Sequence, residues 1–199
     1  MSDQQISRIL ISRLSAIGDC VLTTPLLCAI RDHFPDAHIT WVTERGPATL
    51  LEGHQALDEL IALPKRWMKS PTEVRQLRSK LRKHRFDLAF DPQGLTKSSL
   101  ITWLSGARRQ IGFHKPRGRE LSRWFNRELV TPTNSHIVDA QLELLSPFGV
   151  YDSVVRFDLP IHPKVESQAE AILRSAHLGC DFVAINCGAG WDSRLWSTY

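Results

Sequence analysis

The loop at residues 15–19, with the sequence SAIGD, has the composition best suited to chemistry in the first part of the chain. It follows a short apolar run at 9–12 and precedes an apolar helical pattern. A carboxylate held at the end of a strand can act as a general base toward a hydroxyl group, which makes Asp19 a candidate catalytic residue. Asp is also a favoured N-cap residue, so helix capping explains the same position. Spacing alone leaves both interpretations open.

Two further polar loops carry groups that suit anions. Residues 91–98 (DPQGLTKS) place Gly94, Lys97 and two hydroxyls near a predicted helix start, and a helix N-terminus favours anions. In the loop 187–196 (CGAGWDSRLW), small residues would let backbone N–H groups approach phosphate oxygens, and an arginine can pair with them in a fork. This loop predicts a diphosphate cradle whose candidate residues are Gly188, Ala189, Ser193 and Arg194.

None of these loops carries an established nucleotide signature. A dinucleotide site of the Rossmann type would need GxGxxG after the first strand, whereas this loop has one glycine and ends in a carboxylate that would repel a pyrophosphate. The second loop lacks the GxxxxGK[ST] pattern of a P-loop. A nicotinamide or flavin enzyme is therefore disfavoured, and we expect no cofactor.

Strand and helix patterns alternate along the chain, and this order must position the loops. Apolar runs predict strands at 9–12, 38–43, 59–63, 87–90, 110–113 and 182–186. Amphipathic or capped segments predict helices at 20–33, 46–52, 71–84, 96–104, 117–126, 136–145 and 165–177. Such alternation argues for an α/β fold with a parallel sheet, in which ligands bind at the carboxyl ends of the strands. All three polar loops follow predicted strands, so we expect them at that edge.

Composition places the chain among ordinary globular proteins. The chain has 199 residues, of which 42% are hydrophobic and 23% charged. No apolar run approaches the roughly 20 residues that a membrane-spanning helix needs. The polar start, MSDQQISR, shows no signal peptide. The four cysteines, at 20, 28, 180 and 187, have no CxxC spacing and predict buried free thiols in a reducing cytoplasm.

Positive charge is concentrated in two zones, although the net charge is only +4. Residues 65–85 hold nine Lys or Arg against one acid, Glu73, and residues 108–127 hold seven against Glu120. Such zones suggest an anionic partner: phosphate, nucleic acid or an acidic membrane surface. For residues 75–85 alone, a solvated helix face is the favoured explanation. The zones lack the interleaved aromatic residues of single-strand nucleic-acid binders, so we expect no nucleic-acid partner.

The end of the chain predicts a second domain that begins but is not completed. A buried strand at 182–186 needs neighbours on both sides, and little sequence follows it. We therefore expect an N-terminal Rossmann-like domain at 1–150, a linker at 151–163, and the start of a truncated domain at 164–199. A function that needs a cleft between two domains would be only half encoded here, so we expect residues 1–199 alone to be inactive.

Several segments in their order resemble glycosyltransferase family 9, the ADP-heptose:lipopolysaccharide heptosyltransferases, and the type I members in particular. The matching segments are ILISRLSAIGDCVLTTPLL, WVTERG, IALPKRWMK, FDLAFDPQGLTKSS, the stretch with Gly112, Arg119 and Glu120, His136 at a helix start, and INCGAGWDSRLW. The resemblance implies a GT-B fold: a Rossmann-like acceptor-binding domain, then a Rossmann-like donor-binding domain, with the active site between them.

The resemblance also implies a reaction. The heptose of ADP-heptose would be transferred to the Kdo–lipid A inner core of lipopolysaccharide, with inversion and without a metal. Asp19 would be the general base, and Arg194 would neutralise the departing diphosphate where the family usually has Lys. Ser15, Gly18 and Gln93 would shape the acceptor side. Cations near the phosphorylated acceptor would be Lys65, Arg66, Lys69, Lys97 and Arg119, whereas Met68 replaces a further basic residue of the type I site.

Two other function classes remain open from the sequence. One is a GT-B transferase that uses a different nucleotide sugar, which donor competition would reveal. The other is a non-catalytic domain that binds an anionic glycolipid, with Asp19 acting only as a helix cap. Because the acceptor is a lipid, the resemblance implies a cytoplasmic protein in peripheral, salt-sensitive contact with the inner face of the bacterial inner membrane.

Overall fold

The computed structural model describes residues 6–179, 181–185 and 188. Contacts divide the chain into two units, Met1–Pro160 and Ile161–Tyr199. The first unit is built on a six-stranded sheet in the order β3-β2-β1-β4-β5-β6, and every neighbouring pair is parallel. Its strands are β1 (Arg8–Ser12), β2 (His38–Glu44), β3 (Glu59–Leu63), β4 (Leu88–Phe90), β5 (Arg109–Phe113) and β6 (Glu128–Val130).

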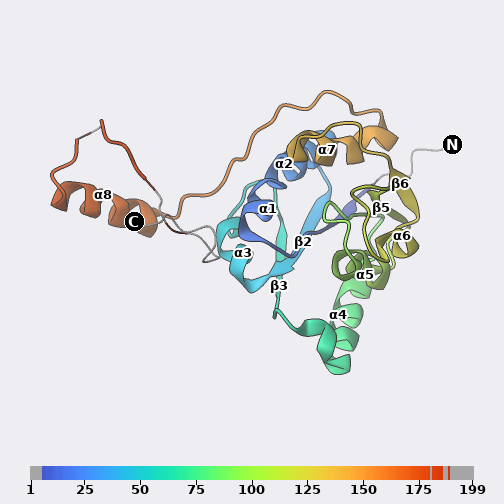
Figure 1. Cartoon of the computed structure of the whole chain (residues 1–199). Helices are drawn as coiled ribbons and strands as arrows, with labels where there is room; N and C mark the ends of the chain where they lie inside the picture. The colour runs from blue at the N-terminus through green and yellow to red at the C-terminus, as the bar shows by residue number, and fades with distance from the viewer. Residues whose placement is uncertain (1–5, 180, 186–187, 189–199) are drawn as a thin grey trace, which may run out of the picture. The chain divides into compact units, whose positions relative to one another are not determined.

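Helices cover both faces of this sheet (Figure 1). The α-helices of the first unit are α1 (Ile17–Val21), α2 (Thr24–His33), α3 (Arg45–Leu51), α4 (Pro71–His84), α5 (Thr96–Ser105), α6 (Ser122–Phe125) and α7 (Ile137–Leu142). Two 3₁₀ helices, η1 (Trp67–Lys69) and η2 (Glu143–Phe148), complete the set. Figure 1 shows α2 and α7 on one side of the sheet and α4 and α5 on the other. The predicted Rossmann-like α/β fold is confirmed.

The alternation of side chains along β1 explains the two-sided core. Ile9 and Ile11 pack with α2 and η2 in one buried cluster, whereas Leu10 packs with α4 and α5 in the other. Successive side chains of a strand point to opposite faces, so a strand that is apolar throughout must be covered twice. This pattern agrees with the place of β1 in the middle of the sheet, between β2 and β4.

The predicted helix at 20–33 is wrong as a single element. α1 ends at Val21 and α2 begins at Thr24, with Pro25 in its first turn. Proline has no backbone N–H to bond to the carbonyl four residues earlier, but it fits the first turn of a new helix. The Thr23 hydroxyl donates to the Asp19 carbonyl at 2.8 Å and so closes the end of α1.

Other predicted elements also need correction. Only Ser122–Phe125 of the predicted helix 117–126 is helical, because Glu120 has a positive φ of 52° that an α-helix does not allow. The predicted helix 136–145 becomes 3₁₀ from Glu143, ahead of Pro147. The short strand β6, paired with β5, was not predicted.

The second unit contains one described helix, α8 (Pro163–Ser175), which has no buried residue. Residues 181–185 form neither helix nor strand, so the predicted strand 182–186 is wrong for its described part. A β-strand exists only through pairing, and no strand pairs with them within the described residues. Residues 151–160, predicted as linker, belong with the first unit, where Arg156 bonds to Asp32 at 2.6 Å. The assignment of 164–199 to a donor domain stays a prediction.

None of the helices in the described residues is long and apolar enough to cross a bilayer.

Candidate active site

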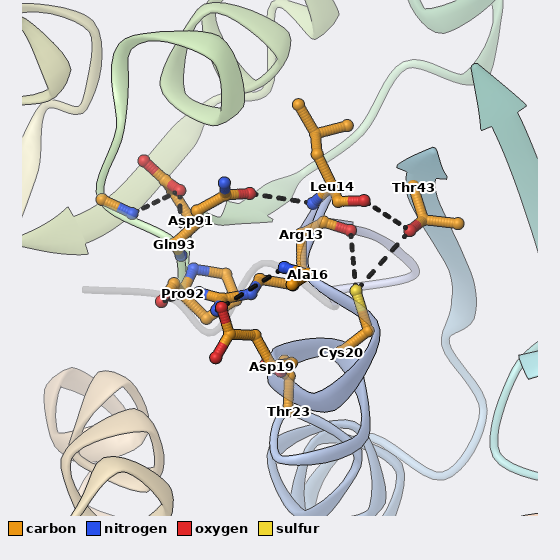
Figure 2. Close-up of polar contacts among 11 residues, drawn as sticks. Arg13, Leu14, Ala16, Asp19, Cys20, Thr23, Thr43, Asp91, Pro92 and Gln93 are labelled. Atoms are coloured by element: carbon orange, nitrogen blue, oxygen red, sulfur yellow. Dashed lines mark hydrogen bonds and ion pairs between the residues drawn. The ribbon is translucent and has the colours of Figure 1, made fainter. Parts of the chain in front are cut away.

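Two of the three predicted loops meet at the centre of the sheet. β1 and β4 are neighbours in the sheet, although about 80 residues separate them in the sequence. The chain leaves β1 toward the face covered by α2 and leaves β4 toward the face covered by α5. This is the topological switch point at which open α/β sheets bind ligands. The loop 13–19 after β1 and the loop 91–95 after β4 form the candidate site (Figure 2).

Side-chain bonds to the backbone hold these two loops together. The Gln93 side-chain oxygen accepts a hydrogen bond from the Leu14 N–H at 2.8 Å, and the Arg13 guanidinium donates to the Pro92 carbonyl at 3.2 Å. Both bonds are buried. The bond from Leu14 shows that the Gln93 side chain fixes the loop of β1, and its predicted part in shaping the acceptor side stays a prediction. Through this bond, Gln93 helps to fix the loop that carries Asp19.

The carboxylate of Asp19 lies at this junction but is not a helix cap of the predicted kind. The N-cap residue of α1 is Ala16, and Asp19 is the third residue of the helix. Its Oδ2 accepts from the Ala16 N–H at 3.3 Å and pairs with the Arg13 guanidinium at 2.8 Å. Figure 2 shows both contacts on the same oxygen. Oδ1 has no protein partner in the described structure, and the side chain is 49% exposed.

Arg13 orients this carboxylate and was missed by the sequence analysis. Its side chain is only 6% exposed, and it bonds to Asp19 and to the Pro92 carbonyl at once. A guanidinium presents its donors in a rigid fork, so the two bonds fix each other's direction. The only signal in the sequence was a charged residue directly after a buried strand. The other predicted residues of this loop lie beside it: Ser15 is half-buried and Gly18 is exposed.

The Cys20 thiol beneath the loop is structural. Its Sγ lies 3.8 Å from the Arg13 carbonyl oxygen and 3.7 Å from the Thr43 hydroxyl. The indole of Trp41 donates to the same Arg13 carbonyl at 3.0 Å. Burial raises the pKa of the Cys20 thiol above its ordinary value, so it stays neutral near pH 7 and is not a nucleophile. Cys20 and Cys28 are the buried free thiols that were predicted, whereas Cys180 and Cys187 lie outside the described residues.

A buried polar network fixes the loop after β4. The carboxylate of Asp91 accepts from the N–H groups of Gln93 and Gly94 at 3.2 and 3.0 Å, and from the Asn126 amide at 2.9 Å. Asn126 in turn accepts from the Thr102 hydroxyl at 2.8 Å. Burial raises the pKa of Asp91, although these hydrogen bonds act in the opposite direction. The network explains how Gln93 reaches Leu14, and Asn126 was another residue that sequence analysis missed.

A carboxylate of the protein itself lies at the first turn of α5, where the second loop suggested an anion site. The Glu120 carboxylate accepts from the Thr96 N–H at 3.0 Å and so uses one backbone donor of that turn. The Thr96 hydroxyl and N–H, with smaller contributions from Arg119 and Lys97, lower the pKa of Glu120. The Arg119 N–H also donates to the Gly94 carbonyl at 2.9 Å. Lys97 and Arg119 themselves are exposed beside this junction.

The cations after β3 lie at the same edge of the sheet but in a separate turn. Lys65, Arg66 and Lys69 are exposed around Trp67, which is buried and anchors the turn. In the part of the chain that the structure describes, no hydrogen bond or ion pair joins them to Asp19. Of the third loop, Gly188 is described outside any helix or strand, whereas Ala189, Ser193 and Arg194 lie outside the described residues.

Comparison with known proteins decides the family. Residues 74–199 match the model of glycosyltransferase family 9 (heptosyltransferase). The chain belongs to glycosyltransferase family 9. The predicted recognition is therefore confirmed, and the family is enzymatic.

Curated relatives point to the same group. The chain is 26% identical over 200 residues to lipopolysaccharide heptosyltransferase 1 of Pseudomonas aeruginosa, covering 95% of this chain and 54% of that protein. It is 29% identical over 148 residues to lipopolysaccharide heptosyltransferase 1 of Escherichia coli K12, covering 70% and 46%. The chain thus spans about half the length of the curated relatives it matches.

Solved structures of family 9 share the fold. A family 9 glycosyltransferase from Veillonella parvula matches with a TM-score of 0.78 at 23% identity, covering 98% of this chain and 57% of that one. The E. coli heptosyltransferase WaaC with ADP-2-deoxy-2-fluoro heptose matches with a TM-score of 0.65 at 28% identity, covering 75% and 50%. The second of these structures contains an analogue of a sugar nucleotide.

Proposed function

We propose that this chain supplies the acceptor-binding domain and the general base of a lipopolysaccharide heptosyltransferase. The donor is ADP-heptose, the acceptor is the Kdo–lipid A inner core, and the transfer is inverting and needs no metal. The observation that carries the proposal is the Asp19 carboxylate, held by buried Arg13 at the switch point of the sheet with Oδ1 facing no protein group in the described structure. The family and the ADP-heptose analogue in a relative support the donor.

The reaction follows from the position of this carboxylate. An acceptor hydroxyl at Oδ1 gives its proton to Asp19 as its oxygen attacks the anomeric carbon of the heptose. The new C–O bond forms on the face opposite the bond to ADP, which breaks and leaves the diphosphate with the electron pair. Arg13 keeps Oδ2 occupied, so only one oxygen is available to the proton. Lys97 and Arg119 would face the acidic acceptor, and Arg194 would balance the charge on departing ADP.

Exchange of Asp19 for Asn tests the proposal. The amide oxygen can still accept from Ala16, but the side chain can no longer take a proton. With the longest open reading frame that contains these 199 residues, we expect ADP release from ADP-heptose and Kdo–lipid A to fall about 10²- to 10⁴-fold, the contribution typical of a general base. Asp36→Asn, at an exposed turn, is the matched control. Wild-type rates in Asp19→Asn would overturn the role of Asp19.

One structural observation favours a second function. Asp19 already has two protein partners, Ala16 and Arg13, so it could serve only to stabilise the loop of an anionic-glycolipid binding domain. That function predicts acceptor binding without ADP release in the wild-type protein. A transferase of a different nucleotide sugar would instead release its nucleotide only with that donor. Donor competition with ADP-heptose and other nucleotide sugars separates these outcomes.

We also propose that the protein works in the cytoplasm and contacts the anionic inner face of the inner membrane through the surface of α5 and α6. Trp124 on α6 is 81% exposed. Leu121, which directly precedes α6, and Trp103 on α5 are exposed too. The rings of Trp103 and Phe125 are in edge contact with centroids 6.1 Å apart. Tryptophan is enriched at membrane interfaces, and the surrounding basic zone 108–127 suits anionic headgroups. The Arg119–Gly94 bond links this surface to the loop of the candidate site.

A further inference from the structure

A cluster of metal-binding side chains lies at the edge of the sheet opposite the candidate active site. His38 is the first residue of β2, Glu59 is the first residue of β3, and His84 is the last residue of α4. In a parallel sheet the first residues of neighbouring strands lie at the same edge, which is the amino edge here. The cluster therefore takes no part in the chemistry of Asp19.

The three side chains converge on one point. The Nε2 of His84 lies 3.4 Å from the Oε2 of Glu59, and the Nε2 of His38 lies 3.9 Å from the same oxygen. One ligand atom from each residue falls within 4.8 Å of the other two. Zinc bonds of about 2.0–2.1 Å to nitrogen and oxygen in a tetrahedron place ligand atoms about 3.3–3.4 Å apart. Small side-chain rotations would bring all three atoms to that spacing.

Neighbouring groups already hold these side chains in place. The second carboxylate oxygen of Glu59, Oε1, pairs with Lys80 at 3.2 Å, which turns Oε2 toward the two imidazoles. The Thr40 hydroxyl donates to Oε2 at 3.4 Å. The ring of His84 is nearly parallel to those of His38 and Phe86, at an interplanar angle of 16° to each, with centroids 6.5 Å and 5.2 Å away. Fixed ligand orientation of this kind is what neighbouring groups provide in metal sites.

The cluster is also open to solvent. The side chains of His84 and Glu59 are 19% and 26% exposed, and that of His38 is 42% exposed. A metal ion can enter without unfolding of the sheet, and water can supply a fourth ligand. Two imidazoles and one carboxylate form a donor set that suits Zn²⁺ and other late divalent transition metals.

We propose that His38, Glu59 and His84 bind a divalent transition-metal ion, and that Zn²⁺ is the preferred ion. The ion joins the Nε2 atoms of both histidines and the Oε2 of Glu59, with water completing a tetrahedron. It cross-links β2, β3 and the C-terminal end of α4, and it therefore stabilises the basic helix on the sheet. The role is structural, and it is independent of the proposed transferase activity.

Calorimetric titration of the metal-stripped chain with Zn²⁺ near neutral pH tests the site. We expect one equivalent whose affinity falls more than about a hundredfold in His38→Ala and in His84→Ala, because loss of an outer-shell partner alone already costs about 10- to 100-fold. His136→Ala, an exposed imidazole beside Asp139, is the matched control and should bind as wild type.

Two further measurements separate loss of metal binding from misfolding of a variant. Co²⁺ should give the visible absorption of a tetrahedral site in the wild-type chain and in His136→Ala, and lose it in His38→Ala, whose exposed ring contributes little to the core. Zn²⁺ should raise the midpoint of thermal unfolding of the wild-type chain and of His136→Ala, but not that of His38→Ala. Absence of binding, or binding that is unchanged in His38→Ala and Glu59→Gln, would overturn the proposal and leave an ordinary ion-pair cluster around Glu59.

Discussion

At the scale of single residues, the position of Asp19 depends on Arg13, which is nearly completely buried. Its guanidinium bonds to a carboxylate on one side and to a backbone carbonyl of the neighbouring loop on the other. The two contacts together decide which carboxylate oxygen stays available. The proposed general base is therefore positioned here by a residue that need not touch the substrate.

Arg13→Lys tests this positioning role. Lysine keeps the positive charge but cannot reach Asp19 and the Pro92 carbonyl together through a rigid fork. In the product of the longest open reading frame that contains these residues, we expect kcat for the proposed heptose transfer to fall about tenfold to a hundredfold with little change in KM, since a misplacement of about 1 Å can cost about a hundredfold. Arg8→Lys, at the exposed opposite end of the same strand, serves as control. An equal loss in both variants would contradict the positioning role.

Glu120 gives a pH-dependent contribution to stability. Its pKa is lowered by the Thr96 hydroxyl and N–H, so the ionised form is favoured in the folded state. The contribution is complete above the ordinary pKa of Glu and is lost as the pH falls through the lower folded-state pKa. Because the carboxylate is exposed, we expect Glu120→Gln to cost only a few tenths of a kcal/mol to about 1 kcal/mol at pH 7.

Urea unfolding at neutral and acidic pH measures this effect. The difference in the free energy of unfolding between wild type and Glu120→Gln should shrink toward zero in acid. Carboxylates present in both proteins, such as Glu143, cancel in that difference. A difference that stays constant with pH would show that the charge of Glu120 contributes nothing to the contact with α5.

Sequence analysis located Asp19 and Gln93 but not the residues that hold them. A carboxylate in a loop after a buried strand is visible from residue type and spacing. The contacts of Arg13 and Asn126 span 79 and 35 residues, so only the strand order brings the partners together. The N-cap interpretation of Asp19, one of the two left open, is wrong by three residues, because the helix begins before the carboxylate rather than after it.

At the scale of elements, the loop 114–120 turns back tightly on the end of β5 at Gly118 and lies close to the loop 91–95 at Gly94, so that both positions require glycine. A Cβ on Gly118 would lie 2.0 Å from the carbonyl oxygen of Phe113, and one on Gly94, which has a positive φ of 65°, would lie 2.5 Å from that of Arg117. Real Cβ atoms do not approach a backbone oxygen so closely. The loop that carries Gln93 is therefore shaped by its neighbour as much as by its own sequence.

Gly118→Ala should destabilise the protein by about 1–3 kcal/mol or more, because backbone must move to admit the methyl group. Gly46→Ala is the matched control, since its Cβ would meet no atom within 4 Å inside α3. Alanine there should be neutral or stabilise by about 0.4–1 kcal/mol. Chemical denaturation of both variants measures these changes. Equal stability of the two variants would contradict the close approach.

The elements were predicted best where periodicity is strong and worst where local conformation decides. The predicted helix 71–84 matches α4, and the strand 59–63 matches β3, because long amphipathic or apolar patterns leave little choice. The break before Pro25 and the positive φ of Glu120 depend on single residues that periodicity does not weigh. The three-residue strand β6 exists only through its pairing with β5, which no local pattern predicts.

At the scale of the whole molecule, the surface of α5 and α6 should bind anionic vesicles. We expect the chain to sediment with vesicles that contain phosphatidylglycerol and not with phosphatidylcholine alone, and we expect binding to weaken as salt screens the basic zone. Trp124→Ala should weaken binding several-fold, whereas Tyr151→Ala, also highly exposed but outside the basic zones, should not. Equal binding of both vesicle types would contradict this surface as the contact.

The bond between Gln93 and Leu14 has a consequence for the order of events during synthesis. Leu14 leaves the ribosome 79 positions before Gln93, the partner that fixes its loop. Asn126, which secures Asp91 beside Gln93, comes later still. The strands β1, β2 and β3 can pair before then, but the segment around Asp19 gains its geometry only after residue 126 has emerged. The candidate catalytic loop is thus made well before the segments that complete its geometry.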